Sequence, residues 1–147
     1  MPHLFAPLSL RGVTLRNRIG VSPMCQYCAT NGLANDWHLA YAGSRAAGGA
    51  GLVVLEATAV EPRGRISHGD LGLWCNAQVE PLARVAAFVA AQGAVPGIQL
   101  AHGGRKGSKS RPWEGDKQLP KTEGGWDLIA PSAIPYGESD RLPAEMT

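Results

Sequence analysis

The stretch that decides the fold class is RIGVSPMCQY, residues 18–27, because it combines a buried strand with reactive side chains at its end. Its apolar pattern predicts a strand over 18–21. Pro23 ends that strand, since proline has no N–H for the ladder and biases the preceding residue toward extended backbone. In α/β folds, ligand sites gather at the carboxyl ends of parallel strands. The thiol of Cys25 and the phenol of Tyr27 are therefore a candidate reaction-site pair, although free cysteine is also among the most buried residue types.

Composition and charge place the chain among single-domain globular proteins. It has 147 residues, of which 44% are hydrophobic and 18% charged, and its 14 basic and 12 acidic residues leave a net charge of +2. This balance argues against nucleic-acid and membrane partners, and no apolar run reaches the length of about 18 residues that a membrane-spanning helix needs. The first residues lack the basic start and long apolar core of a signal peptide. Three cysteines cannot all pair, so we expect a reducing compartment and a cytoplasmic location.

Two further apolar runs read as strands. LVVLEATAV, residues 52–60, is almost unbroken, which is typical of a strand covered on both faces of a parallel sheet. Glu56 interrupts it and needs a partner, either in a site or in a structural hydrogen bond, because a lone buried carboxylate is costly. VPGIQLA, residues 95–101, contains Gln99. Its amide carries donors and acceptors that suit a heteroaromatic ring such as a flavin or nucleobase, while a hydrogen-bonded core glutamine is the alternative.

Helix signals fill the two stretches between these strands. Asn35 or Asp36 can cap a helix that ends at Gly48, and Asn76 can cap a second helix that ends at Gly93. The expected core face of the first helix, at helical spacing, consists of Trp37, Ala40, Tyr41, Ser44 and Ala47. The expected core face of the second helix consists of Val79, Leu82, Ala83, Ala86, Val89 and Ala90.

The resulting order is βαβαβ, for which right-handed crossovers predict a parallel sheet. Three parallel strands can open either a doubly wound sheet or a (β/α)8 barrel, and the lack of a GxGxxG motif after the first strand disfavours the dinucleotide-binding fold. We expect a hairpin around Gly12 before the sheet and an exposed crossover over 61–75. An irregular excursion follows the third strand, with Trp113 and Trp126 as its anchors and a short strand near 129–134.

Cys25 and Cys28 form a C-x-x-C pair, which can be a redox dithiol or half of a zinc site. A dithiol site needs its first cysteine at a helix N-terminus, whereas the predicted helix begins near Asn35. A zinc site needs two more ligands, and Cys75 and the histidines lack the usual close spacing. We therefore expect no metal site. His38 is expected on the helix surface or at the edge of the core, with a place in a site as the alternative.

Several motifs, in one order along the chain, resemble the Old Yellow Enzyme family. They are LRNRI at 15–19, SPMCQY at 22–27, EATAV at 56–60, GRIS at 64–67, GIQLAHGGRK at 97–106 and APSAI at 130–134. The chain is most similar to the bacterial ene-reductases with a cysteine near the flavin, the thermophilic-like or xenobiotic-reductase group. Because the motifs run over the whole chain, together they are far more specific than any one of them.

This resemblance implies a (β/α)8 TIM barrel that holds FMN at the carboxyl ends of its strands. In the family, NAD(P)H reduces the flavin, whose N5 then gives hydride to the β-carbon of an alkene conjugated to a carbonyl or nitro group. By this resemblance Tyr27 touches the substrate, and Cys25 tunes the flavin potential without acting as a covalent nucleophile. The residues expected to bind the flavin are Ser22, Pro23, Met24, Cys25, Ala57 and Gln99. Gly103 stands where the family more often has alanine.

Length is the main departure from the family, since a (β/α)8 barrel takes about 250 residues. We expect residues 1–147 to be the N-terminal part of one FMN-binding barrel domain, with roughly three βα units, an N-terminal hairpin and a loop excursion. One hypothesis is an NAD(P)H:flavin ene-reductase that acts on activated alkenes and needs a complementary C-terminal fragment or a homo-oligomer. The alternative is a non-catalytic fragment or assembly module that does not bind FMN alone, because three strands leave open edges and an uncovered apolar face.

Overall fold

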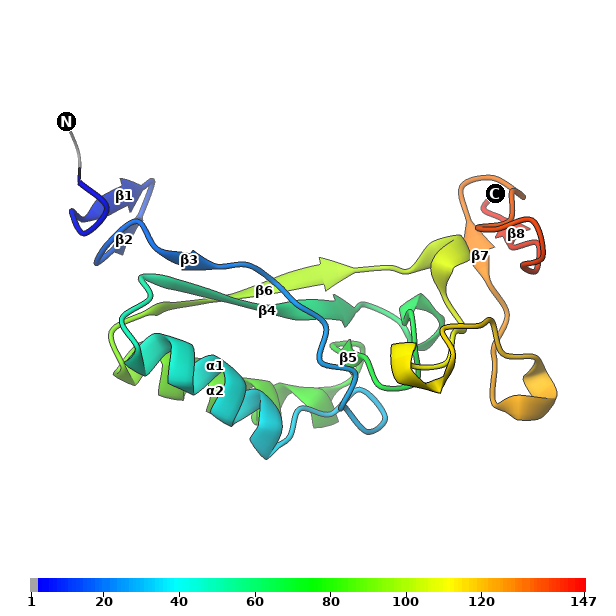
Figure 1. Cartoon of the computed structure of the whole chain (residues 1–147), viewed down its shortest axis with the longest axis horizontal. Coiled ribbons are helices and arrows are strands. Elements are labelled where there is room, and N and C mark those ends of the chain that lie inside the picture. The colour runs from blue at the N-terminus through cyan, green and yellow to red at the C-terminus, as the bar shows by residue number, and fades with distance from the viewer. Residues whose placement is uncertain (1–2) are drawn as a thin grey trace.

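The computed structural model describes residues 3–147, in which two helices cover one side of a four-stranded sheet (Figure 1). The sheet contains β3 (Gly20–Val21), β4 (Leu52–Ala59), β5 (Leu71–Gly72) and β6 (Val95–Ala101), and the helices are α1 (Asp36–Ala47) and α2 (Val79–Ala91). An N-terminal hairpin of β1 (Leu8–Leu10) and β2 (Val13–Leu15) lies at one end of the molecule. The pair β7 (Ile129–Ala130) and β8 (Ala144–Glu145) lies at the other end. The hairpin and the irregular excursion are thus present as expected.

β4 is the central strand and pairs in parallel with β3 on one side and β6 on the other. Its first residue, Leu52, is the register partner of both Gly20 and Val95. β3, β4 and β6 are therefore neighbours in the sheet in their chain order, with α1 and α2 in the crossovers between them. A doubly wound sheet reverses its strand order at a switch point, whereas a barrel does not. The order β3-β4-β6 is that of the first units of a barrel.

α1 begins at Asp36 because the side-chain oxygen of Asn35 accepts a hydrogen bond from the amide of Trp37, at 3.0 Å. The expected core face of this helix is wrong, since Trp37 is 57% exposed. The residues that face the core are His38, Ala42, Gly43 and Ala46. Small residues fill this face because the neighbouring helix lies close. A Cβ added at Gly43 would lie 2.5 Å from a ring carbon of Phe88 on α2.

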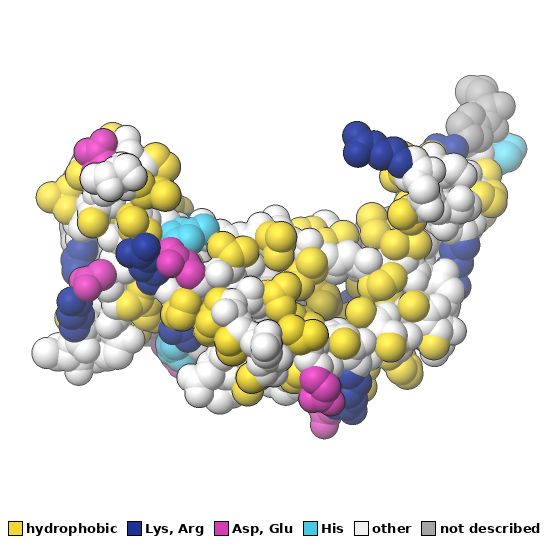
Figure 2. Space-filling model, turned by 180° about the vertical axis from the view of Figure 1, so that it is seen from behind, with side chains coloured by type: hydrophobic (Ala, Val, Ile, Leu, Met, Phe, Trp, Pro, Cys, Tyr) yellow, Lys and Arg dark blue, Asp and Glu magenta, His cyan; other side chains and the backbone are white. Residues whose placement is uncertain are grey.

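α2 is preceded by a 3-10 turn over Asn76–Gln78 and buries Leu82, Val85 and Val89 against the sheet. Its core face therefore differs from the expected stripe, of which Val79 is 51% exposed and Ala83 and Ala90 are also exposed. Of these exposed residues, Val79 and Ala83 line a groove of about 330 Å³ together with residues of β4 and β6. Figure 2 shows hydrophobic side chains spread over this middle part of the molecule, between its two raised ends. α2 thus has more apolar residues than the rest of residues 3–147 buries.

The segment between β4 and α2 is not the exposed crossover expected over 61–75. β5 pairs with the end of β4, where Leu71 is fully buried opposite Thr58. Asp70 is 2% exposed and accepts hydrogen bonds of 2.7 Å from the Ser67 hydroxyl and from the amide of Ile66. Because these polar groups satisfy one another, the turn can be buried despite its polar sequence.

Trp126 anchors the excursion, as expected. Its indole N–H donates to the carbonyl of Arg63 at 3.0 Å, and the guanidinium of Arg65 lies 4.8 Å from its ring centroid. Of the strand expected near 129–134, only Ile129–Ala130 forms, and it pairs with the last strand of the chain. Within the described residues, neither helix has the length and apolarity that crossing a bilayer requires.

Candidate functional site

The segment after β3 follows the edge of β4 toward the carboxyl end of the sheet (Figure 1). Of the strand expected over 18–21, only Gly20 and Val21 join the ladder, and neither is buried. The ladder ends just before Pro23, as the sequence predicts. Beyond the proline, the side chain of Met24 is 46% exposed. The amide of Gln26 donates to Oε2 of Glu56 at 2.8 Å, which ties the segment to β4. The residues SPMCQY therefore lie beside EATA, as their expected common role requires.

A β-bulge at Glu56 decides which side chains face the same way on the sheet. Leu55 pairs with Ile98 and Ala57 pairs with Gln99, so Glu56 has no register partner on β6. A bulge adds one residue to the strand, so each side chain after it faces the opposite side of the sheet from the one it would face in a regular strand. Leu55 and Glu56 are both buried toward the helices, whereas Ala57 and Gln99 lie side by side on the other face.

Gln99 is exposed and not a hydrogen-bonded core residue. Within residues 3–147 its side-chain amide makes no hydrogen bond to a protein atom, and the amide nitrogens of Met24 and Cys25 make none either. The neighbouring Ala57 is small and partly accessible. Unpaired donors and acceptors beside a small residue fit the flat, heteroaromatic ring of a flavin, whose pyrimidine edge offers both kinds of partner.

Cys25 and Tyr27 lie together, as the sequence predicts. The thiol of Cys25 lies near the backbone N–H of Ala57 and the side chain of Tyr27. Burial, and then the nearby carboxylates of Asp70 and Glu56, raise the pKa of Cys25 above its ordinary value of 9.0. A thiol that is protonated at neutral pH is a poor nucleophile, because the thiolate is the reactive form. This protonation state supports the expected non-covalent role of Cys25.

Tyr27 is held in a demanding conformation. Its φ of 55° is left-handed, which is uncommon for a residue with a bulky side chain. Its ring packs edge-on against Trp113, with centroids 6.0 Å apart. Burial, followed by the Cys25 and Asp70 charges, raises the pKa of Tyr27 to about 12. The phenol is thus a hydrogen-bond donor at neutral pH.

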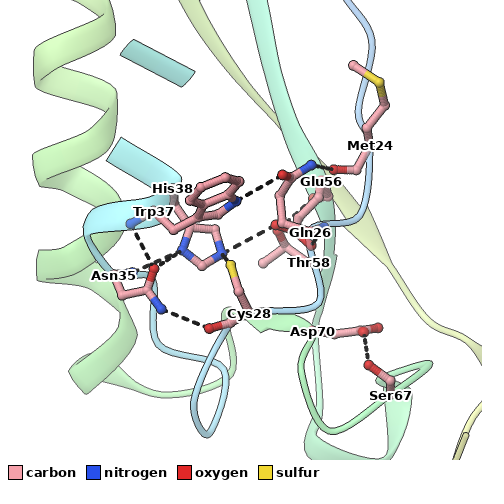
Figure 3. A network of polar contacts seen from close by, with 10 residues as sticks. All are labelled: Met24, Gln26, Cys28, Asn35, Trp37, His38, Glu56, Thr58, Ser67 and Asp70. Carbon is pink, nitrogen blue, oxygen red and sulfur yellow. Dashed lines mark hydrogen bonds and ion pairs between the residues drawn. The ribbon is translucent and has the colours of Figure 1, made fainter. Parts of the chain in front are cut away.

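A buried polar network lies between residues 22–28, the site segment, and α1 (Figure 3). Nε2 of His38 lies 3.3 Å from Oε1 of Glu56 and 3.6 Å from Sγ of Cys28. Glu56 therefore has the structural partner that its burial requires. His38 is only 1% exposed, so its expected place on the helix surface or core edge is wrong. The i, i+4, i+8 spacing of His38 with two alanines on α1 was the signal that could have identified this face.

Cys25, Cys28 and Cys75 are all free thiols. Residues 3–147 bring no three His, Cys, Asp or Glu side chains together in a group that could hold a metal ion. The first cysteine of the C-x-x-C pair, Cys25, lies in the irregular segment before α1, whereas a redox dithiol has its first cysteine in the first turn of a helix.

Known proteins resemble this chain in sequence and in fold. The model of the NADH:flavin oxidoreductase / NADH oxidase family matches residues 3–133. NADPH dehydrogenases from Listeria monocytogenes and from a Geobacillus species are 48% and 46% identical to it, over 100% and 98% of the chain. The chain spans only 40% and 38% of these relatives' own lengths.

Among solved structures, morphinone reductase superposes with a TM-score of 0.82 at 26% identity, over 99% of this chain and 40% of that enzyme. The Old Yellow Enzyme from Pichia sp. AKU4542 also gives a TM-score of 0.82, at 25% identity over 99% of this chain and 38% of that protein. These superpositions confirm the expected α/β fold as part of a (β/α)8 barrel.

The family name and the related structures agree on the cofactors as well. A second structure of morphinone reductase, with a TM-score of 0.79 to this chain, contains tetrahydroNAD. FMN and NAD(P)H, the two cofactors expected from the sequence, are those of this family. With its strand-end motifs in the family's order and nearly all of its length matched, the chain belongs to the NADH:flavin oxidoreductase / NADH oxidase family, which includes the Old Yellow Enzymes.

Proposed function

We propose that this chain provides the first flavin-facing strand ends of an FMN-dependent ene-reductase, which uses NAD(P)H to reduce C=C bonds conjugated to a carbonyl or nitro group. The observation that carries this proposal is the shared open face of Ala57 and Gln99, with the Cys25 thiol against the Ala57 amide. In this proposal residues 1–147 form the N-terminal part of one FMN-binding barrel domain.

Each site residue has a role that its surroundings support. Bound FMN supplies hydride transfer between NAD(P)H and the β-carbon of the alkene. Gln99 offers its unpaired amide to the pyrimidine edge, and the backbone amides of Met24 and Cys25 are further donors. Ser22 and Pro23 carry the chain past the ring edge. Ala57 leaves room for a flat ring because its side chain is a single methyl group.

Tyr27 and Cys25 face the reacting groups in this proposal. The phenol of Tyr27 keeps its proton at neutral pH, so it can donate a hydrogen bond to a bound substrate. The thiol of Cys25 stays neutral and therefore adds a polarizable group beside the flavin without attacking the substrate. The groups that hold the FMN phosphate and the substrate carbonyl are proposed to come from outside residues 3–147.

A second candidate function is an assembly module that does not bind FMN alone. The observation that favours it is the apolar groove between α2 and β6, beside which Ile98 and Leu100 are 36% and 61% exposed. Apolar surface of this kind marks a contact site for another polypeptide. This function predicts a chain that associates with a complementary fragment or a second copy and is indifferent to FMN.

The visible absorbance of the purified chain separates the two functions. Bound FMN gives flavin bands that survive desalting, and added FMN loses fluorescence as it binds. The ene-reductase proposal expects both effects, in the chain or in its complex with a complementary fragment identified by mass spectrometry. A colourless chain that leaves FMN fluorescence unchanged, with and without that fragment, would contradict the ene-reductase proposal and support the assembly module.

A further inference from the structure

A buried histidine–carboxylate pair lies directly behind the candidate flavin-binding segment (Figure 3). The side chains of His38 and Glu56 are 1% and 2% exposed, and Nε2 of the histidine lies 3.3 Å from Oε1 of the carboxylate. Taking such groups out of water is unfavourable unless hydrogen bonds compensate. Here the carboxylate of Glu56 accepts a bond from Gln26, in the segment that carries Cys25 and Tyr27, and the imidazole of His38 is bonded to Asn35 at the start of α1.

The bulge in β4 is what brings Glu56 to this place. In a regular strand with Leu55 facing the helices, the next side chain would face the open side of the sheet. Because Glu56 has no register partner on β6, it turns toward α1 instead, and Ala57 takes the open face. The same backbone irregularity therefore creates both the buried carboxylate and the flavin-facing alanine.

Glu56 holds the segment through the backbone of Gln26. Its Oε2 accepts the Gln26 amide proton at 2.8 Å. The Gln26 side chain adds two bonds, accepting from the indole N–H of Trp37 at 3.0 Å and donating to the carbonyl of Met24 at 2.7 Å. Gln26 directly follows Cys25, so any shift of its amide moves the thiol as well.

His38 holds the carboxylate and the far end of the segment from the first turn of α1. The amide of Asn35 donates to Nδ1 of His38 at 3.0 Å, and Oδ1 of Asn35 lies 2.9 Å from the same nitrogen, while Nε2 faces Glu56. The side chain of Asn35 donates to the carbonyl of Cys28 at 2.8 Å. The N-terminus of α1 thus both orients the imidazole of His38 and holds the site segment at Cys28.

The geometry excludes a nucleophilic triad of Cys28, His38 and Glu56. In such a triad the thiol and the carboxylate bind opposite nitrogens of the imidazole. Here both approach Nε2, while Nδ1 faces Asn35. Burial, and then the charge of Glu56, also raise the pKa of Cys28.

We propose that the His38–Glu56 pair is a positioning group that clamps the Gln26 amide to β4 and thereby holds the Cys25 thiol against Ala57. Insofar as it concerns flavin, this role rests on the proposed function. The clamp itself is a property of this chain and is measurable without cofactor.

Hydrogen exchange of the Gln26 amide tests the clamp directly. Glu56→Ala removes the acceptor, and exchange at Gln26 should accelerate about ten- to hundredfold, as expected for losing a hydrogen bond to a charged group. Glu56→Gln keeps the size and one acceptor oxygen, so its exchange should lie between those of the wild type and the alanine variant. Iodoacetamide labelling of Cys25, followed by peptide mass spectrometry, should rise in the same order.

Val85→Ala is the matched control, because Val85 is 2% exposed on α2 and its apolar side chain makes none of the clamp's hydrogen bonds. It lowers global stability without touching Gln26. The proposal is overturned if Gln26 keeps wild-type protection in Glu56→Ala, or if Val85→Ala opens Gln26 and Cys25 equally. Should Glu56→Ala not fold, Glu56→Gln decides, and wild-type exchange at its Gln26 amide overturns the proposal.

A flavin measurement then separates this inference from the proposed function. If the wild-type chain, alone and with its complementary fragment, ignores FMN, the proposed function fails, and the Gln26 exchange still decides the clamp. If the wild type binds FMN, Glu56→Ala should shift the visible flavin bands while Val85→Ala leaves them in place. Unshifted bands in a folded Glu56→Ala holoprotein contradict a role at the flavin.

Discussion

Ala57 of β4 and Gln99 of β6 are register partners on the open face of the sheet, directly after the bulge at Glu56. Without the bulge the two strands would keep their alternation, and Ala57 would turn toward the helices. The relationship brings a small side chain and an unpaired amide to one edge, next to the Cys25 thiol.

Gln99→Ala should raise the dissociation constant of FMN about three- to tenfold, which is the usual effect of losing one neutral hydrogen bond. The reason is that Gln99 offers the free side-chain amide on this face. Quenching of FMN fluorescence during titration measures the dissociation constant. Gln92→Ala, at the C-terminal end of α2, changes the same residue type away from the strand ends and should bind FMN as the wild type does. Equal affinity for the Gln99 and Gln92 variants would remove Gln99 from the site.

Cys25→Ala should keep FMN bound while shifting the flavin potential and the preference among alkene substrates. The thiol touches the Ala57 amide and Tyr27 but is protonated, so it changes the polarity around the ring more than its binding. A spectroelectrochemical titration and a comparison of kcat/KM across substrates measure the two effects. Cys75→Ala, which changes an exposed thiol, serves as the control. Complete loss of FMN from a folded Cys25→Ala protein would speak against the proposed role.

The strand ends were predictable from the sequence because local patterns alone identify the three apolar runs and the motifs that follow them. A cap at Asn35 or Asp36 was predictable for the same reason, and in the structure it is Asn35. The bulge at Glu56 was not, because it depends on how β4 pairs with β6, which no local pattern encodes. The likeness to a known family named Ala57 and Gln99 without explaining why they share a face.

The core face of α1 shows why helix patterns mislead when small residues do the packing. The sequence favours the face with Trp37 and Tyr41, the large apolar residues. In the structure Trp37 points outward and binds Gln26, while Gly43 admits the ring of Phe88. The sequence pattern favours the helix surface or the core edge for His38, because nothing near it shows that its partner, Glu56, lies 18 residues later on another element. Pairing between distant elements is what a single sequence leaves open.

The stability of the chain should depend on the ionisation of Asp70. Burial raises the pKa of Asp70 above its ordinary value of 3.8, although bonds from Ser67 and Ile66 oppose the shift. The folded state therefore binds this proton more tightly than the unfolded state does. The resulting contribution to the free energy of unfolding is fully present below pH 3.8 and is lost as pH rises through the raised pKa.

Urea unfolding across this pH window measures the effect. The wild type should lose stability relative to Asp70→Asn as pH rises, because the asparagine variant has no charge to bury. Asp127→Asn is the control, since the Asp127 side chain is 74% exposed, and it should follow the wild-type slope. Parallel curves for the wild type and Asp70→Asn would show that burial does not affect the Asp70 carboxyl.

Gly69→Ala should destabilise the buried turn before β5. A Cβ at this position would clash with the backbone carbonyl of Tyr27 and approach the Arg111 side chain. The carbonyl belongs to a residue already in a left-handed conformation and packed on Trp113, so the Tyr27 backbone has little freedom to move. We expect a loss of about 1–3 kcal/mol in the free energy of unfolding, typical of forcing an extra carbon into a packed region.

Gly12→Ala is the matched control, because nothing lies within 4 Å of a Cβ at that hairpin position. Urea unfolding of the two variants should therefore differ, with Gly12→Ala close to the wild type. Iodoacetamide labelling of Cys25 should also accelerate in Gly69→Ala only, since displacing Tyr27 uncovers the neighbouring thiol. If Gly69→Ala unfolds at the wild-type urea concentration with unchanged labelling, the turn is not held at this contact, and the position of Tyr27 must be fixed from the Trp113 side.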